Sequence, residues 1–496
     1  MPTFPMGQVP EYFAGLKPED TAVVFADRSL SWSRFAGAVT RRAHGMMARG
    51  VKEGDFVTIA LPNGTAFLET VYAALRLGAI PNPVPSRLPV AELNGILELA
   101  RPGLVVGTLP AEIKGWNSVA SEWEGEDASG LLPNRISRHW KAMTSGGSTG
   151  RPKLIVASGE GVVDLDSINP LMPTGPDSKC CHVPGPLYHN GPFSTSMMAL
   201  NGGRCLVGSL RFDPEETLRL VATHKADWLY QVPTMMHRIW SLPPEVRSRY
   251  DLSSLKRVLH LAAPCPPWLK EAWIEWLGAD VVWELYGGTE AQGFTLIAGT
   301  EWLQHRGSVG RFVGGAQVKI VDDDGSELPT GEVGEVFILA PGGRGSTYHY
   351  LGAEARAMGD WESLGDMGWL DADGYLYLAD RRTDLILRGG ANIYPAEVEA
   401  AIDECPEVSS SVVIGLPHAD LGATVHAIVQ LRSGQRNTRD AELALRSFLK
   451  DRLASYKLPA TFEFVDDFTR DEAGKVRRSA LRAERMGKQP TNATQS

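Results

Sequence analysis

The chain is organised around one glycine-rich stretch, Met143-Thr-Ser-Gly-Gly-Ser-Thr-Gly-Arg-Pro-Lys153. Glycine lets successive backbone N–H groups turn toward one point and lets phosphate oxygens approach closely. The Lys153 ammonium adds a point charge, and further donors come from the hydroxyls of Ser145, Ser148 and Thr149. The apolar Leu-Ile-Val that follows is typical of a buried strand. The stretch therefore predicts an anion-binding loop between two structured elements.

A P-loop and a flexible linker are two other interpretations of this stretch. It is not a P-loop, because Pro152 stands where that motif has a glycine before the lysine. A flexible Ser/Gly linker has the same composition, and these residues alone leave that alternative open.

The composition is that of a soluble globular protein. The chain has 496 residues, of which 43% are hydrophobic and 22% charged, enough for about three domains. With 49 basic and 59 acidic residues the net charge is −10, which argues against a nucleic-acid-binding surface. The sequence has neither an apolar run long enough to span a membrane nor the features of a signal peptide at Met-Pro-Thr-Phe-Pro. The cysteines form no C-x-x-C pair, which favours free thiols in a reducing cytoplasm: Cys180, Cys181, Cys205, Cys265 and Cys405.

The first part of the chain alternates strand and helix patterns. Thr21–Phe25 and Asp55–Ala60 are predicted strands, and Ser31–Arg49 and Ala66–Leu77 are predicted helices. The same alternation continues from 154 to 300, which predicts an α/β layer architecture. Within it, three tryptophans in Pro266–Gly278 indicate a helix packed on the core rather than a cofactor site.

The pattern changes after residue 307. Val318–Val321 and Val333–Leu339 have strand patterns and are separated by the turn Asp322–Gly325, which predicts a small antiparallel, barrel-like region. The charged segment Asp380–Asp384 then marks a domain boundary. The unit that follows is predicted to contain two helices and two strands: Pro395–Glu404, Val412–Gly415, Thr424–Leu431 and Asp440–Arg452.

Seven motifs in a fixed order resemble the adenylate-forming superfamily of acyl-CoA synthetases, luciferases and peptide-synthetase adenylation domains. The similarity extends from about Asp20 to Leu481. Beside the glycine-rich stretch, the matching segments are Pro186–Gly191, Tyr286–Glu290, Gly307–Gly310, Gly365–Trp369, Asp380–Asp384 with Gly389-Gly390, and Gly474-Lys475.

The resemblance implies an α/β fold in two parts. A large N-terminal domain, 1–380, would contain two α/β subdomains and a small β-barrel. A hinge at 381–384, with Thr383 at its centre, would precede a small mobile α+β C-terminal domain, 385–486, and a disordered tail, 487–496.

The implied reaction begins with a carboxylate that attacks the α-phosphate of ATP and releases pyrophosphate. Two anions must meet, so catalysis is mostly charge neutralisation and positioning. By resemblance, Glu290 binds Mg²⁺, Thr289 donates to the α-phosphate and Lys475 stabilises charge on its oxygens. His189 belongs to the motif beside the acyl group. The implied nucleotide-binding residues are Ser145, Gly146, Gly147, Ser148, Thr149, Gly150, Lys153, Ala262, Ala263, Pro264, Tyr286, Gly287, Gly288, Asp366 and Arg381.

In the implied second step a thiol, that of coenzyme A, attacks the acyl-adenylate. Rotation of the C-terminal domain would withdraw Lys475 and bring Gly389 and Gly390 to line a pantetheine tunnel.

The same resemblance places an acyl pocket at His189, Asn190, Gly191, Phe193, Met235, Gly288, Ala291 and Gly293. No acidic residue follows His189 closely to pair with an amino group, and the small residues after Tyr286 leave room for a bulky group. The Ala262–Lys270 run is similar to bacterial ligases for fatty, bile or steroid acids. A bulky or long apolar acid, such as a fatty, steroid or aromatic acid, is therefore expected.

Departures from the family pattern suggest an outlying branch. Gly146, Leu154 and Thr383 are unusual at their positions, and Leu261-Ala262 replaces a glycine pair. Three alternatives to the acyl-CoA ligase remain: an acyl-AMP ligase that loads a carrier protein, a luciferase-like monooxygenase, and a non-catalytic nucleotide-binding paralogue. Intact charged residues argue against the last: Lys153, Glu290, Asp366, Arg381 and Lys475. A homodimer is compatible with any of them.

Overall fold

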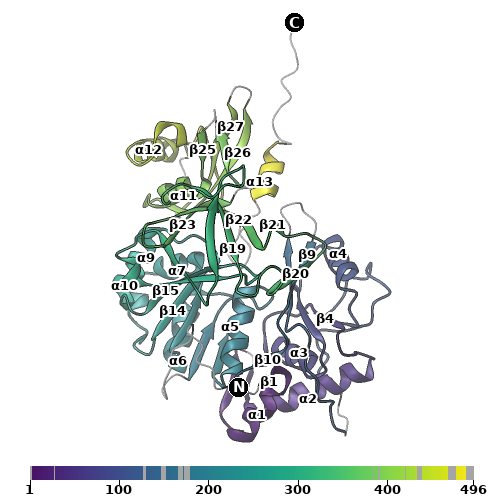
Figure 1. Ribbon diagram of the computed structural model, residues 1–496. Helices are drawn as coiled ribbons and strands as arrows, with labels where there is room; N and C mark the ends of the chain where they lie inside the picture. Colours follow the sequence, from purple (N-terminus) through teal and green to yellow (C-terminus); the bar gives the residue numbers. More distant parts are fainter. Residues whose placement is uncertain are drawn as a thin grey trace.

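The computed structural model shows a large N-terminal lobe and a smaller C-terminal lobe, seen at the top of Figure 1. It describes residues 3–26, 28–126, 130–146, 152–165, 171, 179–381, 384–388, 391–418, 421–432, 438–466, 476 and 478–486. Within these ranges, none of the helices combines the length and the apolar content needed to cross a membrane. All five cysteines are free, as their spacing predicts.

The N-terminal lobe is built on one long mixed sheet. Its central strands are parallel and lie in the order β15 (Val282–Gly287), β14 (Arg257–Leu261), β13 (Trp228–Gln231), β11 (Cys180–Val183), β12 (Cys205–Gly208) and β2 (Thr21–Phe25), with β3 (Arg28–Ser31) antiparallel at the edge. Helices α5 (Asn190–Asn201), α6 (Pro214–His224), α7 (Pro233–Trp240) and α9 (Pro267–Leu277) connect these strands.

Both faces of this sheet are buried, and successive side chains along a strand point to opposite faces. Trp228 and Tyr230 belong to one hydrophobic core, whereas Leu229 between them belongs to a second core. The tryptophan-rich segment is helix α9, and Trp273 is fully buried in the second core. The prediction of a core-packing helix is thus confirmed.

The expected antiparallel region is present and continues the parallel sheet directly. Beyond β15 the sheet runs through β16 (Phe294–Ala298), β17 (Ser308–Val313), β23 (Leu376–Arg381), β22 (Trp361–Leu370), β19 (Gly334–Leu339) and β18 (Gln317–Val321), and β21 (Arg356–Met358) pairs with β22. The curved β19–β22 ladder lies between the two lobes in Figure 1.

A second α/β unit comes from the first part of the chain. Its parallel sheet has the order β5 (Ile80–Pro83), β4 (Phe56–Ile59), β6 (Leu104–Val106) and β7 (Ser118–Val119), with helices α2 (Trp32–Ala48), α3 (Thr65–Arg76) and α4 (Val90–Ala100). The Ser31 hydroxyl caps α2 by accepting from the Arg34 amide at 3.4 Å. The strands and helices predicted before residue 82 are therefore confirmed to within about a residue at each end.

The glycine-rich stretch joins the strands of a hairpin. Strands β8 (Ala142–Gly146) and β9 (Pro152–Ala157) pair antiparallel, with Ser145 opposite Lys153. Strand β20 (Tyr348–Leu351) adds to the other edge of β9, which brings a segment about 200 residues distant in sequence beside the loop. The hairpin therefore presents Lys153 at one end of a three-stranded sheet.

The C-terminal lobe has its own sheet and its own hydrophobic core. The core is formed by residues between Ile386 and Leu453. Strands β25 (Ala391–Ile393), β24 (Ile386–Arg388), β27 (Gly422–Leu431), β26 (Val408–His418) and β28 (Thr461–Phe464) form the sheet, with helices α11 (Pro395–Asp403), α12 (Thr438–Lys450) and α13 (Arg478–Met486). The helices and strands predicted for this part lie within these elements or overlap them closely.

Candidate active site

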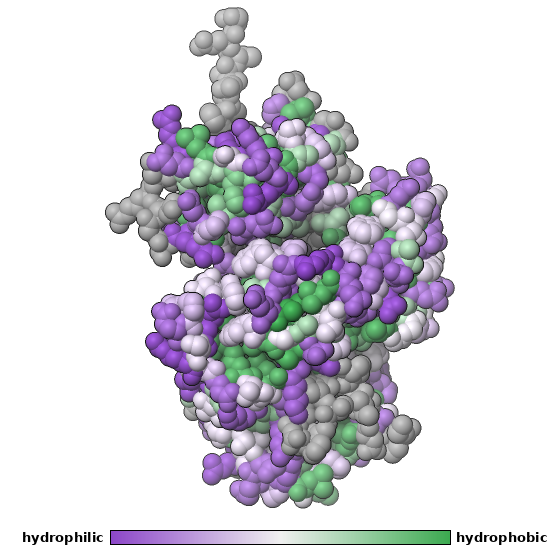
Figure 2. All heavy atoms as spheres, turned by 90° about the vertical axis from the view of Figure 1, so that its left-hand side faces the viewer, coloured by the Kyte–Doolittle hydropathy of each residue, from purple (hydrophilic) through white to green (hydrophobic). Residues whose placement is uncertain are grey.

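A large cavity lies where the two lobes meet. Its volume is about 2180 Å³, and residues of both lobes line it. Figure 2 shows the outer surface at this junction, with the C-terminal lobe at the top. The predicted site residues that line the cavity are Lys153, His189, Asn190, Gly191, Ala262, Ala263, Pro264, Tyr286, Gly287, Gly288, Thr289, Glu290 and Asp366.

The sheet topology explains why these segments meet. Strands β14 and β15 are parallel neighbours, so the residues after Leu261 and after Gly287 emerge at the same edge of the sheet. Ligands of open α/β sheets bind beyond the carboxyl ends of the strands. The chain turns sharply there, since Ala262 has φ of 75° and Ala291 has φ of 53°. A side chain in this left-handed region costs roughly 1 to 2 kcal/mol, which explains the preference for glycine that Ala262 departs from.

Glu290 is the centre of a buried charged cluster. Its side chain is 9% exposed, and the Lys153 Nζ lies 3.7 Å from its Oε1. The Tyr350 hydroxyl donates to the same oxygen at 2.6 Å, and the Lys153 ammonium lies 3.9 Å from the Tyr350 ring centroid. Burial, followed by the Glu290 charge, raises the pKa of Tyr350, so its hydroxyl remains a donor to the carboxylate. Tyr350 is therefore a site residue that the motifs did not identify.

Glu290 Oε2 faces Gly288. A Cβ atom placed on Gly288 would lie 2.8 Å from Oε2 and 2.6 Å from Leu364 Cδ1, so a larger residue would displace the carboxylate. The described residues contain no cluster of three or more His, Cys, Asp or Glu side chains able to hold a metal ion. Mg²⁺ does not need such a cluster, because it is commonly bound by one or two carboxylates together with water and phosphate oxygens. Glu290 lines the cavity and offers one such carboxylate, so it fits this requirement.

A second hydrogen-bonded pair joins the end of β15 in the parallel sheet to β22 in the antiparallel region. The Tyr286 hydroxyl donates to Asp366 Oδ2 at 2.7 Å, although the two residues are 80 positions apart. Asp366 lies on β22 opposite Arg381 of β23, so the backbone pairing also brings Arg381 close. An aromatic ring fixed by a carboxylate is suited to hold a base and its sugar hydroxyls.

Part of the predicted acyl pocket lies elsewhere in this structure. Phe193 is buried beside Trp140, with ring centroids 6.0 Å apart, and Met235 is buried in the same core. Ala291 is exposed, and a Cβ atom on Gly293 would lie 2.6 Å from the Ala316 Cβ. None of these four residues lines the cavity, whereas His189, Asn190, Gly191 and Gly288 do.

Several predicted residues lie outside the described part of the chain. They are Gly147, Ser148, Thr149, Gly150, Thr383, Gly389, Gly390, Lys475 and the tail 487–496. For Ser145 and Arg381 the structure describes the backbone alone.

Lys141 is a second residue that the motifs missed. Its side chain is buried, and its Nζ lies 3.0 Å from Ser194 Oγ and donates to Asn190 Oδ1. Burial lowers the pKa of Lys141 to about 7, and the negative charge of Glu290 partly opposes this shift. A buried lysine so close to the glycine-rich hairpin has no counterpart in the motifs, and no local signal in the sequence distinguishes it from a surface lysine.

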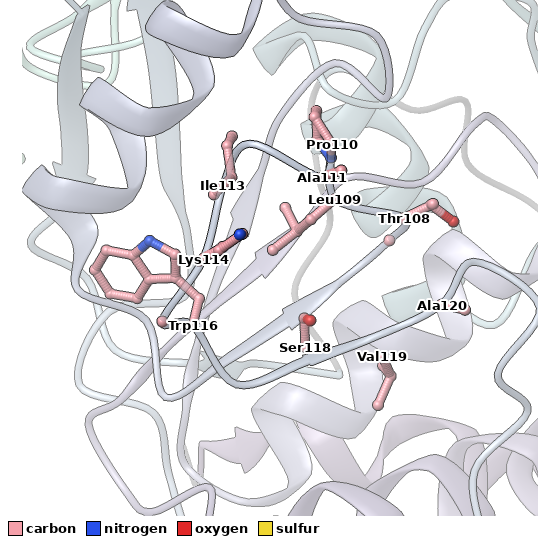
Figure 3. Close-up of a pocket in the computed structure, with 12 residues that line it drawn as sticks. Thr108, Leu109, Pro110, Ala111, Ile113, Lys114, Trp116, Ser118, Val119 and Ala120 are labelled. Carbon is pink, nitrogen blue, oxygen red and sulfur yellow. The ribbon is translucent and has the colours of Figure 1, made fainter.

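A second hollow, of about 440 Å³, is formed by the loop of residues 107–120 alone (Figure 3). Lys114 is the one charged side chain among its lining residues, all of which are described, and the hollow includes no predicted site residue. It therefore adds nothing to the site between the lobes.

Comparisons with known proteins show the family of the chain. The family model for AMP-binding enzyme matches residues 11–348, and the model for its C-terminal domain matches residues 397–475. A feruloyl-CoA synthase of Amycolatopsis sp is 31% identical over 96% of this chain and 98% of its own length. An indoleacetate–CoA ligase of Aromatoleum aromaticum is 28% identical over 95% of this chain and 96% of its own.

The fold is shared with a solved structure. The o-succinylbenzoate CoA synthetase of Bacillus subtilis, in complex with its acyl-adenylate intermediate, superimposes with a TM-score of 0.79 at 24% identity, covering 97% of this chain and 98% of that one. The chain thus belongs to the AMP-binding enzyme family, the adenylate-forming superfamily, in its acyl-CoA synthetase branch.

Proposed function

We propose that the chain activates a bulky aromatic carboxylic acid as acyl-AMP and then transfers the acyl group to the thiol of coenzyme A. The observation that carries this proposal is the convergence, in one cavity, of the Lys153–Glu290 cluster and the Tyr286–Asp366 pair. Both features line a cavity of about 2180 Å³, a space large enough for a nucleotide and an acid.

In the first step, a carboxylate oxygen of the acid forms a bond to the α-phosphorus of ATP. The bond from that phosphorus to the oxygen bridging the β-phosphate breaks, and pyrophosphate leaves with the electron pair. Lys153 holds the β- and γ-phosphates together with the glycine-rich loop, and Thr289 donates to the α-phosphate. Tyr286 stacks on the adenine, and Asp366 accepts from the ribose hydroxyls. Magnesium held by Glu290 would supply charge neutralisation at the phosphate oxygens.

In the second step, the thiol sulfur attacks the acyl carbonyl and AMP departs as the leaving group. The C-terminal domain, 385–486, rotates about Thr383 between the steps, so that Lys475 serves the first and the Gly389-Gly390 segment serves the second. Two separate hydrophobic cores support such a motion, because each lobe can move without exposing the interior of the other.

The preference for an aromatic acid among bulky apolar acids has two supports. Aromatic side chains line the cavity beside the predicted acyl segment: Tyr188, Tyr230 and Trp268. Flat rings of this kind pack well against a planar substrate. The similar proteins include enzymes named for ferulate and for indoleacetate, both aromatic acids.

Pyrophosphate release across a panel of acids tests this function. The panel would contain cinnamate, indole-3-acetate, decanoate and a bile acid, each assayed with ATP and Mg²⁺, with and without coenzyme A. We expect the fastest release with an aromatic acid and acyl-CoA as the final product. Acyl transfer to a carrier protein but not to coenzyme A would instead indicate the carrier-loading alternative. Nucleotide binding without pyrophosphate release from any acid would indicate a non-catalytic paralogue.

A further inference from the structure

Lys141 is a buried cation placed directly behind the acyl segment of the cavity. Its side chain is 5% exposed, and its Nζ lies 4.2 Å from the Trp140 ring centroid. The lysine immediately precedes β8, the first strand of the glycine-rich hairpin. The negative charge of Glu290, which lines the same cavity, raises the pKa of Lys141 against the larger effect of burial. Its hydrogen-bond partners, Asn190 Oδ1 and Ser194 Oγ, are both uncharged, so a cation buried here has an electrostatic cost that a bound anion would offset.

Lys141 fixes the orientation of the Asn190 side chain. Asn190 Oδ1 accepts from the Lys141 ammonium and from the Ser194 hydroxyl, the latter at 3.1 Å. The reverse orientation would place the amide N–H donors against an ammonium group, which also carries only donors. The carboxamide therefore has its oxygen toward Lys141 and its nitrogen on the other side.

The Asn190 carboxamide nitrogen is available to a ligand. Asn190 lines the cavity, and among the described residues its Nδ2 has no hydrogen-bond acceptor. It is also the first residue of helix α5, whose amino-terminal end favours negative charge. The neighbouring His189 lines the same wall. A donor, a cation behind it and the positive end of a helix dipole thus converge on one point of the cavity.

We propose that Asn190 and Lys141 form the subsite for the carboxylate of the substrate acid, in which Asn190 Nδ2 donates to a carboxylate oxygen and Lys141 acts through Asn190 as a positioning residue. The subsite rests on the proposed function and deepens it, because it names the groups that hold the attacking oxygen near the α-phosphate. The subsite recognises the carboxylate group that all candidate acids share. The aromatic side chains that line the cavity would discriminate among the acids.

The test compares an acid with its uncharged primary amide. Dissociation constants would be measured below neutral pH for cinnamate and cinnamamide, and for indole-3-acetate and its amide, with the wild type and with Lys141→Met. We expect K141M to weaken binding of the acids by about tenfold, the effect of removing one nearby charge, and to leave binding of the amides within about twofold. Equal weakening of acids and amides would overturn the proposal, because a merely structural lysine would affect both.

Asn190→Asp tests the subsite by replacing the hydrogen-bond donor that faces the ligand with an acceptor. Aspartate can still accept from Lys141 and Ser194, which preserves the buried contacts, but it offers the cavity an acceptor in place of a donor. We expect N190D to bind the acids at least about tenfold more weakly and to bind the amides relatively better. Unchanged preference for the acids over the amides in N190D would contradict the subsite.

Two further variants separate charge from packing. Lys141→Arg retains the cation and is expected to recover part of the preference for acids that K141M loses. Ser194→Ala removes a hydroxyl that contacts the same groups and leaves both Lys141 and Asn190 in place, so its preference is expected to stay close to that of the wild type. If the wild type releases pyrophosphate with no acid, the proposed function itself fails. If the wild type is active and K141M retains the wild-type preference, only the subsite fails.

Discussion

Replacing Lys475 with alanine is expected to lower the rate of acyl-adenylate formation by about a thousandfold, the scale of removing one donor from a charge that develops in the transition state. Lys475 lies outside the described residues, and the expectation rests on the Gly474-Lys475 motif and on the match of the C-terminal family model through residue 475. Adenylate formation would be measured as pyrophosphate release in a single turnover.

The same variant should still form thioester from supplied acyl-adenylate. Thiol attack needs no charge neutralisation at the α-phosphate, so K475A is expected to retain a rate within about threefold of the wild type in this second assay. Comparable losses in both steps would show that Lys475 has no step-specific role, and the domain rotation between steps would lose its main support.

Replacing Glu290 with glutamine is expected to lower adenylation by roughly a hundredfold to a thousandfold and to raise the Mg²⁺ concentration needed for half-maximal rate. Glutamine retains the size of the side chain but loses the charge that sits 3.7 Å from Lys153 Nζ and accepts from Tyr350. Rates would be measured over a titration of Mg²⁺ at saturating ATP.

Two further variants test whether the loss of adenylation is specific to the Glu290 carboxylate. Tyr350→Phe removes the hydrogen bond to Glu290 and leaves the carboxylate, so a loss of about tenfold is expected. Glu354→Gln removes an exposed carboxylate at the rim of the same cavity and should leave the Mg²⁺ dependence unchanged. A Mg²⁺ dependence in E290Q equal to that of the wild type would exclude Glu290 as the metal ligand.

Local patterns predicted the elements of the fold well. Strand Thr21–Phe25 and helix α2 with its Ser31 cap follow from alternation, periodicity and a capping hydroxyl, all of which are encoded within a few residues. The buried tryptophan face of α9 follows from helical spacing in the same way. These elements can be predicted from the sequence because the residues that determine each of them are close together along the chain.

The contacts that complete the site depend on pairing between distant segments. Tyr350 reaches Glu290 because β20 pairs with β9, and no pattern near Tyr350 indicates that partner. Asp366 was expected from its motif, but its hydrogen bond to Tyr286 depends on the register of an antiparallel sheet. Lys141 is buried by helix α5 and Trp140, which its own neighbours in sequence do not reveal.

Two details show where resemblance and geometry differ. The Ala262 position, unusual for the family, adopts the left-handed conformation that glycine favours, so the backbone retains its shape at an energetic cost. Phe193 of α5 and Met235 of α7 pack into a hydrophobic core of the N-terminal lobe and do not line the cavity. Motif order thus locates the cleft, and packing decides which of the neighbouring side chains line it.

The central claim is that the carboxylate of the acid attacks the α-phosphate of ATP within this cleft. The most direct measurement uses an aromatic acid whose carboxylate carries heavy oxygen, followed by mass spectrometry of the AMP released after thioester formation. One labelled oxygen is expected to be transferred to AMP in each turnover, because the acid oxygen that bonds to phosphorus leaves with it. Unlabelled AMP accompanied by labelled phosphate or pyrophosphate would contradict it.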